Sequence, residues 1–305
     1  RLEEECHKRD IRIIIDFVIN HSSSKHQWFV DACEYLKKLP EGQEPDLNEC
    51  PYVDYYHFAR EQVSGDYYQV SGSDWYYEGV FWSEMPDLNL SNEALRTELE
   101  DISRFWIDMG VDGFRMDAVM HFEENDTTFN TETLNWLFSF CTSLNPDFYM
   151  VSEVWANKAT ITNYYASETP SMFNFDLADT EGKLIKAARG NYKAASLVEN
   201  MVGYQTDYAE KNPNFIDAPF IANHDMGRVA NGLTKNADNM KMACGLLMMM
   251  NGNPFVYYGE EIGMSSSGKK DENKRLPMIW SDTDETGMTD GPLDADKDIV
   301  SEFSG

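Results

Sequence analysis

The sequence lacks the features that would place it across a membrane or on a nucleic acid. Its longest apolar run, residues 242–250, has only nine residues and contains Gly245, whereas a transmembrane helix needs about 20. Positive charge is scarce, with 25 Lys and Arg against 53 Asp and Glu, so the formal net charge is −28. Such an acidic surface repels phosphate backbones. We therefore expect no membrane-spanning segment in this stretch and no nucleic-acid partner.

Paired cysteines and phosphate-binding loops are also missing. The five cysteines are far apart and form no CxxC pair, which indicates neither a zinc site nor a disulfide scaffold. No GxGxxG or GxxxxGK[ST] pattern follows a strand-like segment, so a nucleotide-binding doubly wound sheet lacks its fingerprint. We expect free or buried thiols.

What is present is enough apolar material for a large core, since 42% of the residues are hydrophobic. Residues 11–19, IRIIIDFVI, are typical of a parallel strand covered on both faces. Strand-like segments recur at residues 111–116, 148–152, 172–177, 218–222 and 254–258, with helical stretches near 26–38, 91–110, 131–145, 181–200 and 235–249. Alternating strands and helices predict a parallel sheet, either a (β/α)8 barrel or a doubly wound sheet.

Polar side chains lie at the ends of several of these strands, where both architectures place their catalytic and ligand-binding residues. Arg115 and Asp117 are two residues apart on a strand, so they point into the same space. A guanidinium favours the ionised form of a neighbouring carboxylate, which suits either a covalent nucleophile or a structural ion pair. Glu153 ends another strand among apolar residues, where desolvation would raise its pKa and prepare a general acid. Asp225 ends a later strand beside His224.

Two carboxylates that share the work of attack and proton transfer are the requirement of glycoside hydrolysis. A metal centre is the competing interpretation of the same strand ends. It would be built from Asp16, His21, His224 and Asp225, but it lacks an HxxxH or HxH ligand pair.

Four short segments together carry a family resemblance. DFVINH (16–21), GFRMD (113–117), EVW (153–155) and NHD (223–225) occur in the order and rough spacing of the four signature regions of the α-amylase family, glycoside hydrolase family 13. Similar stretches at residues 25–29, 252–264 and 275–280 extend the resemblance over nearly the whole chain.

The resemblance implies a (β/α)8 TIM barrel, an α/β fold. In the family the segment at residues 16–21 ends the third strand, yet only ten residues precede IRIIIDFVI here. We therefore expect an incomplete barrel with strands 3 to 8 present, as a fragment of the catalytic domain. The implied domains are residues 1–21 with strand 3, residues 22–86 as an inserted domain B, and residues 87–305 with strands 4 to 8 and the following loop. Residues 22–86 are too long for a plain loop, which agrees with an insertion.

By motif match, the resemblance implies a role for each site residue. Asp117 is implied to be the nucleophile, Glu153 the acid/base, and Asp225 the residue that fixes the sugar at the cleaved subsite. Sugar contacts are implied at His21, Arg115 and His224, and contacts to the next sugar at Asp271 and Arg275. The resemblance also implies that Asn20 and His121 help to bind a structural calcium ion.

Two details favour one branch of the family. MPDLN at residues 85–89 resembles a group intermediate between oligo-1,6-glucosidases and neopullulanases, and Ala118 stands where oligo-1,6-glucosidases usually carry Val. We therefore expect a retaining hydrolase of α-1,4 bonds in starch-type glucans and maltooligosaccharides. The alternatives are an α-glucosidase or transglycosylase on short oligosaccharides, including α-1,6-linked ones, and a non-catalytic amylase-like protein that binds glucan or a partner. All three acids are present, which argues against the last.

Overall fold

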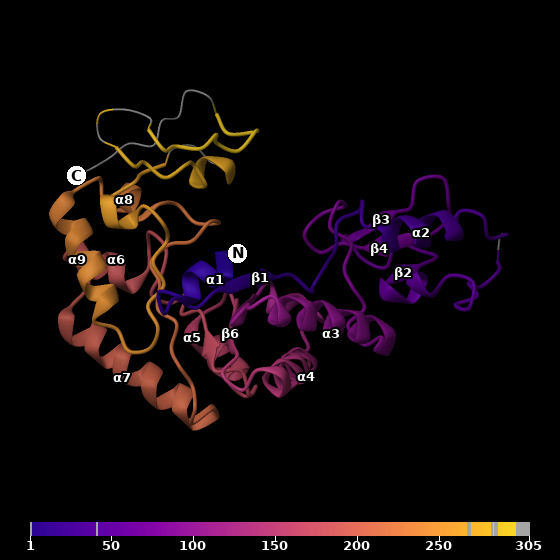
Figure 1. Ribbon diagram of the computed structural model, residues 1–305, viewed down its shortest axis with the longest axis horizontal. Coiled ribbons are helices and arrows are strands. Elements are labelled where there is room, and N and C mark those ends of the chain that lie inside the picture. The colour runs from indigo at the N-terminus through magenta and orange to yellow at the C-terminus, as the bar shows by residue number, and fades with distance from the viewer. Residues whose placement is uncertain (1, 41, 267–269, 282, 284–285, 297–305) are drawn as a thin grey trace. The chain divides into compact units, whose positions relative to one another are not determined.

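The computed structural model describes residues 2–40, 42–266, 270–281, 283 and 286–296. The chain forms two compact units, coloured from indigo to yellow along the sequence in Figure 1. The first comprises Arg1–Glu153 with Ser167–Thr169, and the second comprises Val154–Ala166 with Pro170–Gly305. No helix in the described part of the chain is long and apolar enough to cross a membrane.

The core of the first unit is a parallel sheet. Strand β5 (Gly113–Met116) lies between β1 (Ile14–Phe17) and β6 (Tyr149–Ser152), so Gly113 pairs with both Ile14 and Tyr149. A side chain at Gly113 would overlap the Tyr149 carbonyl oxygen, which explains the glycine. The strands expected at residues 11–19, 111–116 and 148–152 are thus present and parallel, as predicted.

Helices α3 (Glu93–Asp108) and α4 (Thr127–Leu144) pack against each other in this unit, with α1 (Leu2–His7) at its start (Figure 1). The expected boundaries shift because of their caps. Helix α3 is capped by Asn92, which accepts a hydrogen bond from the Leu95 N–H at 2.8 Å, so the helix begins after the start of the stretch expected at residues 91–110. Helix α4 begins four residues before the expected Thr131, because Asp126 caps it through the Phe129 N–H.

Residues 22–86 have a small core of their own. They form helix α2 (Gln27–Leu36), a 3₁₀ turn η1 (Pro51–Tyr55) and an antiparallel sheet in the order β2 (Phe58–Ala59), β4 (Tyr76–Glu78), β3 (Tyr67–Gln69). Phe29 of α2 packs against the rings of Tyr56, Phe58 and Tyr77, with centroids 4.8–5.9 Å apart. Aromatic contacts therefore contribute to the core of this segment, together with buried aliphatic residues such as Leu36, Val53 and Val70.

The second unit has less regular strand than the sequence predicts. Strand β7 (Ser171–Met172) is short, and residues 218–222 and 254–258 contribute only two parallel bridges, Phe173 with Ala218 and Phe220 with Phe255. Pro219 and Pro254 explain the difference, because proline has no N–H to donate to a ladder. The predicted extended strands are therefore wrong in length, although the parallel direction is right.

Helices make up much of the rest of this unit. They are α5 (Lys158–Tyr164), α6 (Lys183–Ala188), α7 (Ala194–Lys211), α8 (Val229–Gly232) and α9 (Ala237–Met248). Further 3₁₀ turns are η2 (Val119–His121) in the first unit, and η3 (Glu260–Ile262) and η4 (Glu272–Lys274) in the second. The single helix expected at residues 181–200 is two helices, because Gly190 adopts φ +76° after α6 and ends it. All five cysteines are free, as expected.

A buried acid in this unit gives a pH-dependent prediction. Asp217 is 4% exposed and accepts hydrogen bonds from Asn174 Nδ2 at 3.2 and 3.3 Å. Burial raises the pKa of Asp217 from 3.8 to about 7. Because the folded value is the higher one, the neutral carboxyl stabilises the fold at low pH, and this contribution is lost as the pH rises through 7. We compare the Tm of Asp217→Asn with that of the parent protein at each pH. We expect this difference in Tm to be more favourable to the variant at pH 8 than at pH 5, by about 5 °C or more.

Calorimetric melts of the full-length protein at the two pH values measure this difference. Asp147→Asn, which changes an exposed carboxyl, is the matched control and should shift Tm equally at both. Parallel Tm curves for Asp217→Asn and the parent protein would contradict the prediction.

Candidate active site

The guanidinium of Arg115 contacts three carboxylates in the first unit. Arg115 Nη1 donates to Asp16 Oδ1 at 2.8 Å and to Asp117 Oδ1, and its Nη2 lies 3.0 Å from Glu153 Oε2. These acids come from the ends of β1, β5 and β6, and the Arg115 side chain is 11% exposed. Burial alone lowers the pKa of Arg115, but the charges of Glu153, Asp16 and Asp117 outweigh it and raise that pKa above its ordinary value. The guanidinium therefore stays charged between three acids.

The sheet explains why these side chains meet. Asp16 pairs in register with Arg115, and Asp117 lies two residues further along, so all three share one face at the carboxyl end of the sheet. Sequence reasoning did pair Arg115 with Asp117, but it did not identify Asp16 and Glu153 as partners of the same guanidinium. Only strand order and register bring these two acids to it.

A turn after β5 supplies a contact that sequence reasoning missed. Ala118 has φ +49° and ψ 38°, a left-handed conformation that is uncommon outside glycine. This conformation directs its N–H at Glu153, whose Oε2 accepts the hydrogen bond at 3.1 Å. The residue type at 118 carries no signal for this contact, because the donor is backbone.

His21 and His121 both contact the ring of Phe81. Phe81 is 5.3 Å from the ring of His21 and 5.0 Å from that of His121, centroid to centroid. Burial lowers the pKa of His21, although the charge of Asp117 opposes this. A neutral imidazole near Asp117 suits a hydrogen bond to a neutral hydroxyl group.

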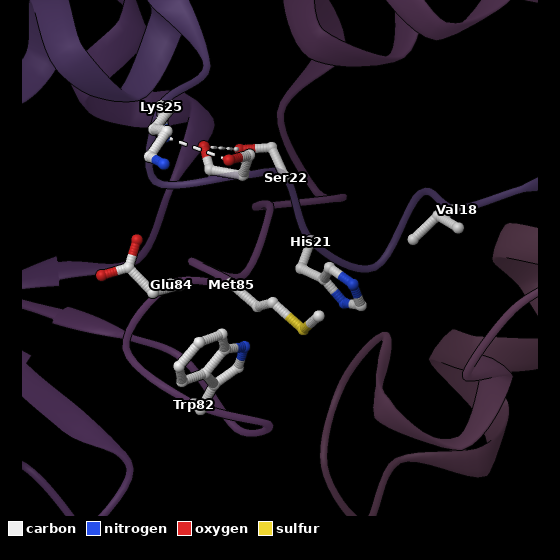
Figure 2. A pocket seen from close by; sticks show the side chains of 8 residues that line it. Val18, His21, Ser22, Lys25, Trp82, Glu84 and Met85 are labelled. Carbon is white, nitrogen blue, oxygen red and sulfur yellow. Dashed lines mark hydrogen bonds between the residues drawn. The ribbon is translucent and has the colours of Figure 1, made fainter. Parts of the chain in front are cut away.

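A hollow of about 800 Å³ opens beside His21, lined by Val18, His21, Ser22, Ser23, Lys25, Trp82, Glu84 and Met85 (Figure 2). The side chains of His21 and Met85 point toward one another, with the Trp82 ring next to Met85 (Figure 2). Trp82 is 51% exposed. A flat exposed ring among hydroxyl and charged groups suits a neutral polyhydroxylated ligand.

In the second unit, Asp225 is held by three cationic or polar side chains. Its Oδ1 accepts from Arg275 Nη2 at 2.6 Å, its Oδ2 lies 2.9 Å from His224 Nε2, and its backbone oxygen accepts from Lys274 Nζ at 2.7 Å. Burial alone raises the pKa of Asp225, but the hydrogen bonds and charges of His224 and Arg275 lower it below its ordinary value. Asp225 is therefore ionised at neutral pH.

The two residues expected at the next sugar differ in their surroundings. Arg275 contacts Asp225 and also donates from Nε to the His224 backbone oxygen at 3.1 Å. Asp271 instead forms an ion pair with Lys274 at 2.7 Å. Lys274, which sequence reasoning did not identify, therefore links Asp271 to the Asp225 backbone.

The surroundings of Asn20 contain oxygen atoms that fit the expected calcium ion. Asn20 is 1% exposed, and its Oδ1 has no hydrogen-bond partner among the described residues. Its Nδ2 donates to Asp87 Oδ1 at 3.4 Å, and Asp87 is itself buried. His121 contacts Glu124 through Nδ1. An unpaired buried amide oxygen near a buried carboxylate fits a cation that prefers oxygen ligands.

Other metal arrangements find less support. Within the described ranges, no group of three or more His, Cys, Asp or Glu side chains is arranged to hold a metal ion. The alternative centre at Asp16, His21, His224 and Asp225 does not fit, because Arg115 and Arg275 already supply positive charge to Asp16 and Asp225.

Known proteins resemble this chain along nearly its whole length. The family profile described as alpha amylase, catalytic domain, matches residues 1–296. Alpha-amylase 3 of Dictyoglomus thermophilum is 38% identical over 285 residues, which cover 92% of this chain and 53% of that protein. Glucan 1,6-alpha-glucosidase of Streptococcus pneumoniae is 31% identical over 291 residues, 87% of this chain and 52% of that protein.

A solved structure, Eubacterium rectale Amy13B, superposes with a TM-score of 0.93 at 44% identity and covers 99% of this chain and 59% of that one. The chain spans about half the length of the curated relatives it matches. The catalytic domain of this family is a (β/α)8 barrel, and the parallel strands and helices seen here agree with that architecture. On the residues matched and the fold shared, the chain belongs to the alpha-amylase family of glycoside hydrolases.

Proposed function

We propose that the protein is a retaining glycoside hydrolase that cleaves α-1,4 bonds in starch-type glucans and maltooligosaccharides. The observation that carries the proposal is the binding of Asp117 and Glu153 by one guanidinium, that of Arg115. Two carboxylates on neighbouring nitrogens of one guanidinium are limited in their separation, and retention requires about 5–5.5 Å between them.

In this mechanism Asp117 attacks the anomeric carbon while the glycosidic C–O bond breaks and Glu153 gives its proton to the departing oxygen. Glu153 then takes a proton from water, whose oxygen attacks the same carbon and releases Asp117. Arg115 and the Ala118 N–H both approach Glu153 Oε2, so the transferred proton belongs on Oε1. Asp225, held ionised by His224 and Arg275, would bind hydroxyl groups of the sugar.

The proposed architecture places strands 3 to 8 of a barrel in this chain, with residues 22–86 as domain B after strand 3. Strand β1 and the next parallel strand in the sheet, β5, are separated by residues that form their own antiparallel sheet. An antiparallel bridge between His21 and Asp87 joins the two ends of this segment. These observations support residues 1–21, 22–86 and 87–305 as the domain boundaries.

Bond preference is the first test of the proposed function. We expect the full-length protein to cleave maltotriose at least about tenfold faster, by kcat/KM, than isomaltose. Ala118 is buried next to Asp117, and one methylene in such a pocket changes discrimination by about 10–200-fold. Ala118→Val should therefore move the ratio toward isomaltose, whereas Ala187→Val in α6 should leave it unchanged. Faster cleavage of isomaltose by the unmodified protein would favour the alternative below.

The second candidate is an α-glucosidase or transglycosylase on short, including α-1,6-linked, oligosaccharides. The similarity to a protein named glucan 1,6-alpha-glucosidase favours it. A non-catalytic glucan-binding role is the third, and the retained Asp117, Glu153 and Asp225 argue against it.

We also propose a structural calcium ion bound by the Asn20 side chain near His121, with Asp87 as a further ligand. The support is the unpartnered Asn20 Oδ1 and the buried Asp87 carboxyl beside it. Calcium at about 100 times its Kd would stabilise the fold by about 2.7 kcal/mol, so Tm should rise by several degrees. Asp87→Asn should weaken this rise, and Asp46→Asn, at an exposed acid of the same unit, should not. Equal shifts in both variants, measured by calorimetry with and without chelator, would contradict the assignment.

A further inference from the structure

Arg228 is buried in the second unit, where it is 1% exposed and its Nη2 has no hydrogen-bond partner among the described residues. Its charge acts on the buried Glu260 carboxyl and opposes the rise in the pKa of Glu260 that burial causes. Its guanidinium lies 4.3 Å from the ring centroid of Tyr257 and 4.4 Å from that of Tyr258, and its Nη1 donates to the Tyr258 backbone oxygen. Two aromatic faces therefore contact this buried cation, and in return Arg228 holds both rings in place.

Both tyrosines use their hydroxyl groups on one short segment. Tyr257 donates to the Lys274 backbone oxygen at 3.1 Å, and Tyr258 donates to the Leu276 backbone oxygen at 2.7 Å. These two oxygens flank Arg275 in the sequence. The Tyr257 backbone is fixed in turn, because its N–H donates to the buried Glu260 at 3.0 Å.

The segment held by the tyrosines is the one that binds Asp225. Lys274 donates to the Asp225 backbone oxygen at 2.7 Å, and Arg275 donates to its Oδ1 at 2.6 Å. A continuous series of contacts thus runs from Arg228 through the two tyrosines and residues 274–276 to the Asp225 carboxylate.

We propose that Arg228, Tyr257 and Tyr258 are positioning residues that hold Lys274 and Arg275 against Asp225. They thereby set the orientation of the Asp225 carboxylate, which binds the sugar. This proposal rests on the proposed function of Asp225. A displacement of about 1 Å in a reacting or orienting group can cost about 100-fold in rate. The tyrosine hydroxyls therefore affect the reaction although they touch neither the substrate nor Asp225.

The hydroxyl groups allow a test that leaves the packing intact. Tyr258→Phe keeps the ring against Arg228 and removes the hydroxyl contacts to the Leu276 backbone oxygen and to Tyr257, whereas removing the buried Arg228 would disturb the fold itself. In the full-length protein we expect Tyr258→Phe to lower kcat about tenfold on maltotriose, the effect of losing the hydrogen bond to Leu276. KM should change less than kcat, because Asp225 binds the distorted sugar most strongly in the transition state.

Tyr192→Phe is the matched control, since Tyr192 accepts a hydrogen bond from Asn200 at 2.8 Å in the same unit, far along the chain from residues 223–276. Its kcat should equal that of the parent protein, and the two Phe variants should have the same Tm. A fall in Tm for Tyr258→Phe with an unchanged kcat would show a structural role and overturn the proposal.

A double-mutant cycle separates positioning from an independent effect. Arg275→Ala removes the link to the Asp225 carboxylate and leaves the Lys274 contact to the Asp225 backbone oxygen, so Tyr258→Phe should cost less than twofold in that background. Additive losses would overturn the proposal. Asp225→Asn distinguishes this outcome from failure of the proposed function. If Asp225→Asn is fully active, the role of Asp225 is wrong; if it is inactive and Tyr258→Phe matches the parent protein, only the positioning role is wrong.

Discussion

Asp117→Asn should lower kcat/KM on maltooligosaccharides by about 10⁴-fold or more in the full-length protein. The amide cannot form the covalent bond to the anomeric carbon, so both steps of the proposed reaction are lost. Its size and its contact with Arg115 Nη1 are nearly preserved, because an amide oxygen still accepts that hydrogen bond. The loss should therefore be chemical rather than structural, and Tm should change little.

Glu153→Gln distinguishes the two acids. A glycosyl fluoride needs no proton on its leaving group, so this variant should still release fluoride in a first burst, although its rate on maltotriose falls by about 10²–10⁴-fold. Asp117→Asn should release no burst from the same donor. Fluoride-electrode measurements in single-turnover conditions give both results. If the two variants behave alike on the fluoride, the assignment of nucleophile and acid/base is wrong.

Replacing Arg115 should affect both stability and activity. Asp16, Asp117 and Glu153 all contact its guanidinium, and the variant Arg115→Ala leaves these acids facing one another without a cation. Removing one partner of a buried ion pair costs about 3–5 kcal/mol. We expect a loss of this size in the free energy of unfolding of the first unit, and at least about a 100-fold loss in kcat, because Asp117 and Glu153 lose their common support.

Arg115→Lys refines this prediction. Lysine keeps the charge but offers a single ammonium, which cannot contact Asp117 and Glu153 through two separate nitrogens. We expect an intermediate loss in stability and a loss in kcat close to that of Arg115→Ala. Arg12→Lys is the matched control, because Arg12 bonds to Asp112 at 2.9 Å from an exposed position in the same unit. Equal kcat values for Arg115→Lys and the parent protein would contradict the role of the guanidinium.

Several elements could be predicted because their signals are local. The dense β-branched run at residues 11–19 indicated a parallel strand, and β1 lies there beside β5. The expected cover on both faces is wrong, because Phe17 alone of the four residues of β1 is buried. The apolar period after residue 91 indicated the helix observed as α3. Where the prediction was wrong, the cause was also local but easy to overlook: Pro219 and Pro254 interrupt strands, Gly190 separates α6 from α7, and Asp126 begins α4 early.

The sequence by itself determined which chemical groups stand at the strand ends. Arg115, Asp117, Glu153 and Asp225 were identified from their positions, because a strand displays residues two apart on the same side and a parallel sheet collects its strand ends at one edge.

The tertiary structure alone decided which further partners these groups have, beyond the pair of Arg115 and Asp117. That Arg115 also binds Asp16 and Glu153 depends on the order and register of β1, β5 and β6. The Ala118 N–H reaches Glu153 through a left-handed turn, and the tyrosine contacts to residues 274 and 276 join segments far apart in the sequence. These partners are backbone atoms or side chains from distant segments, so no local pattern of residue types encodes them, and only the packed chain brings them within hydrogen-bond distance.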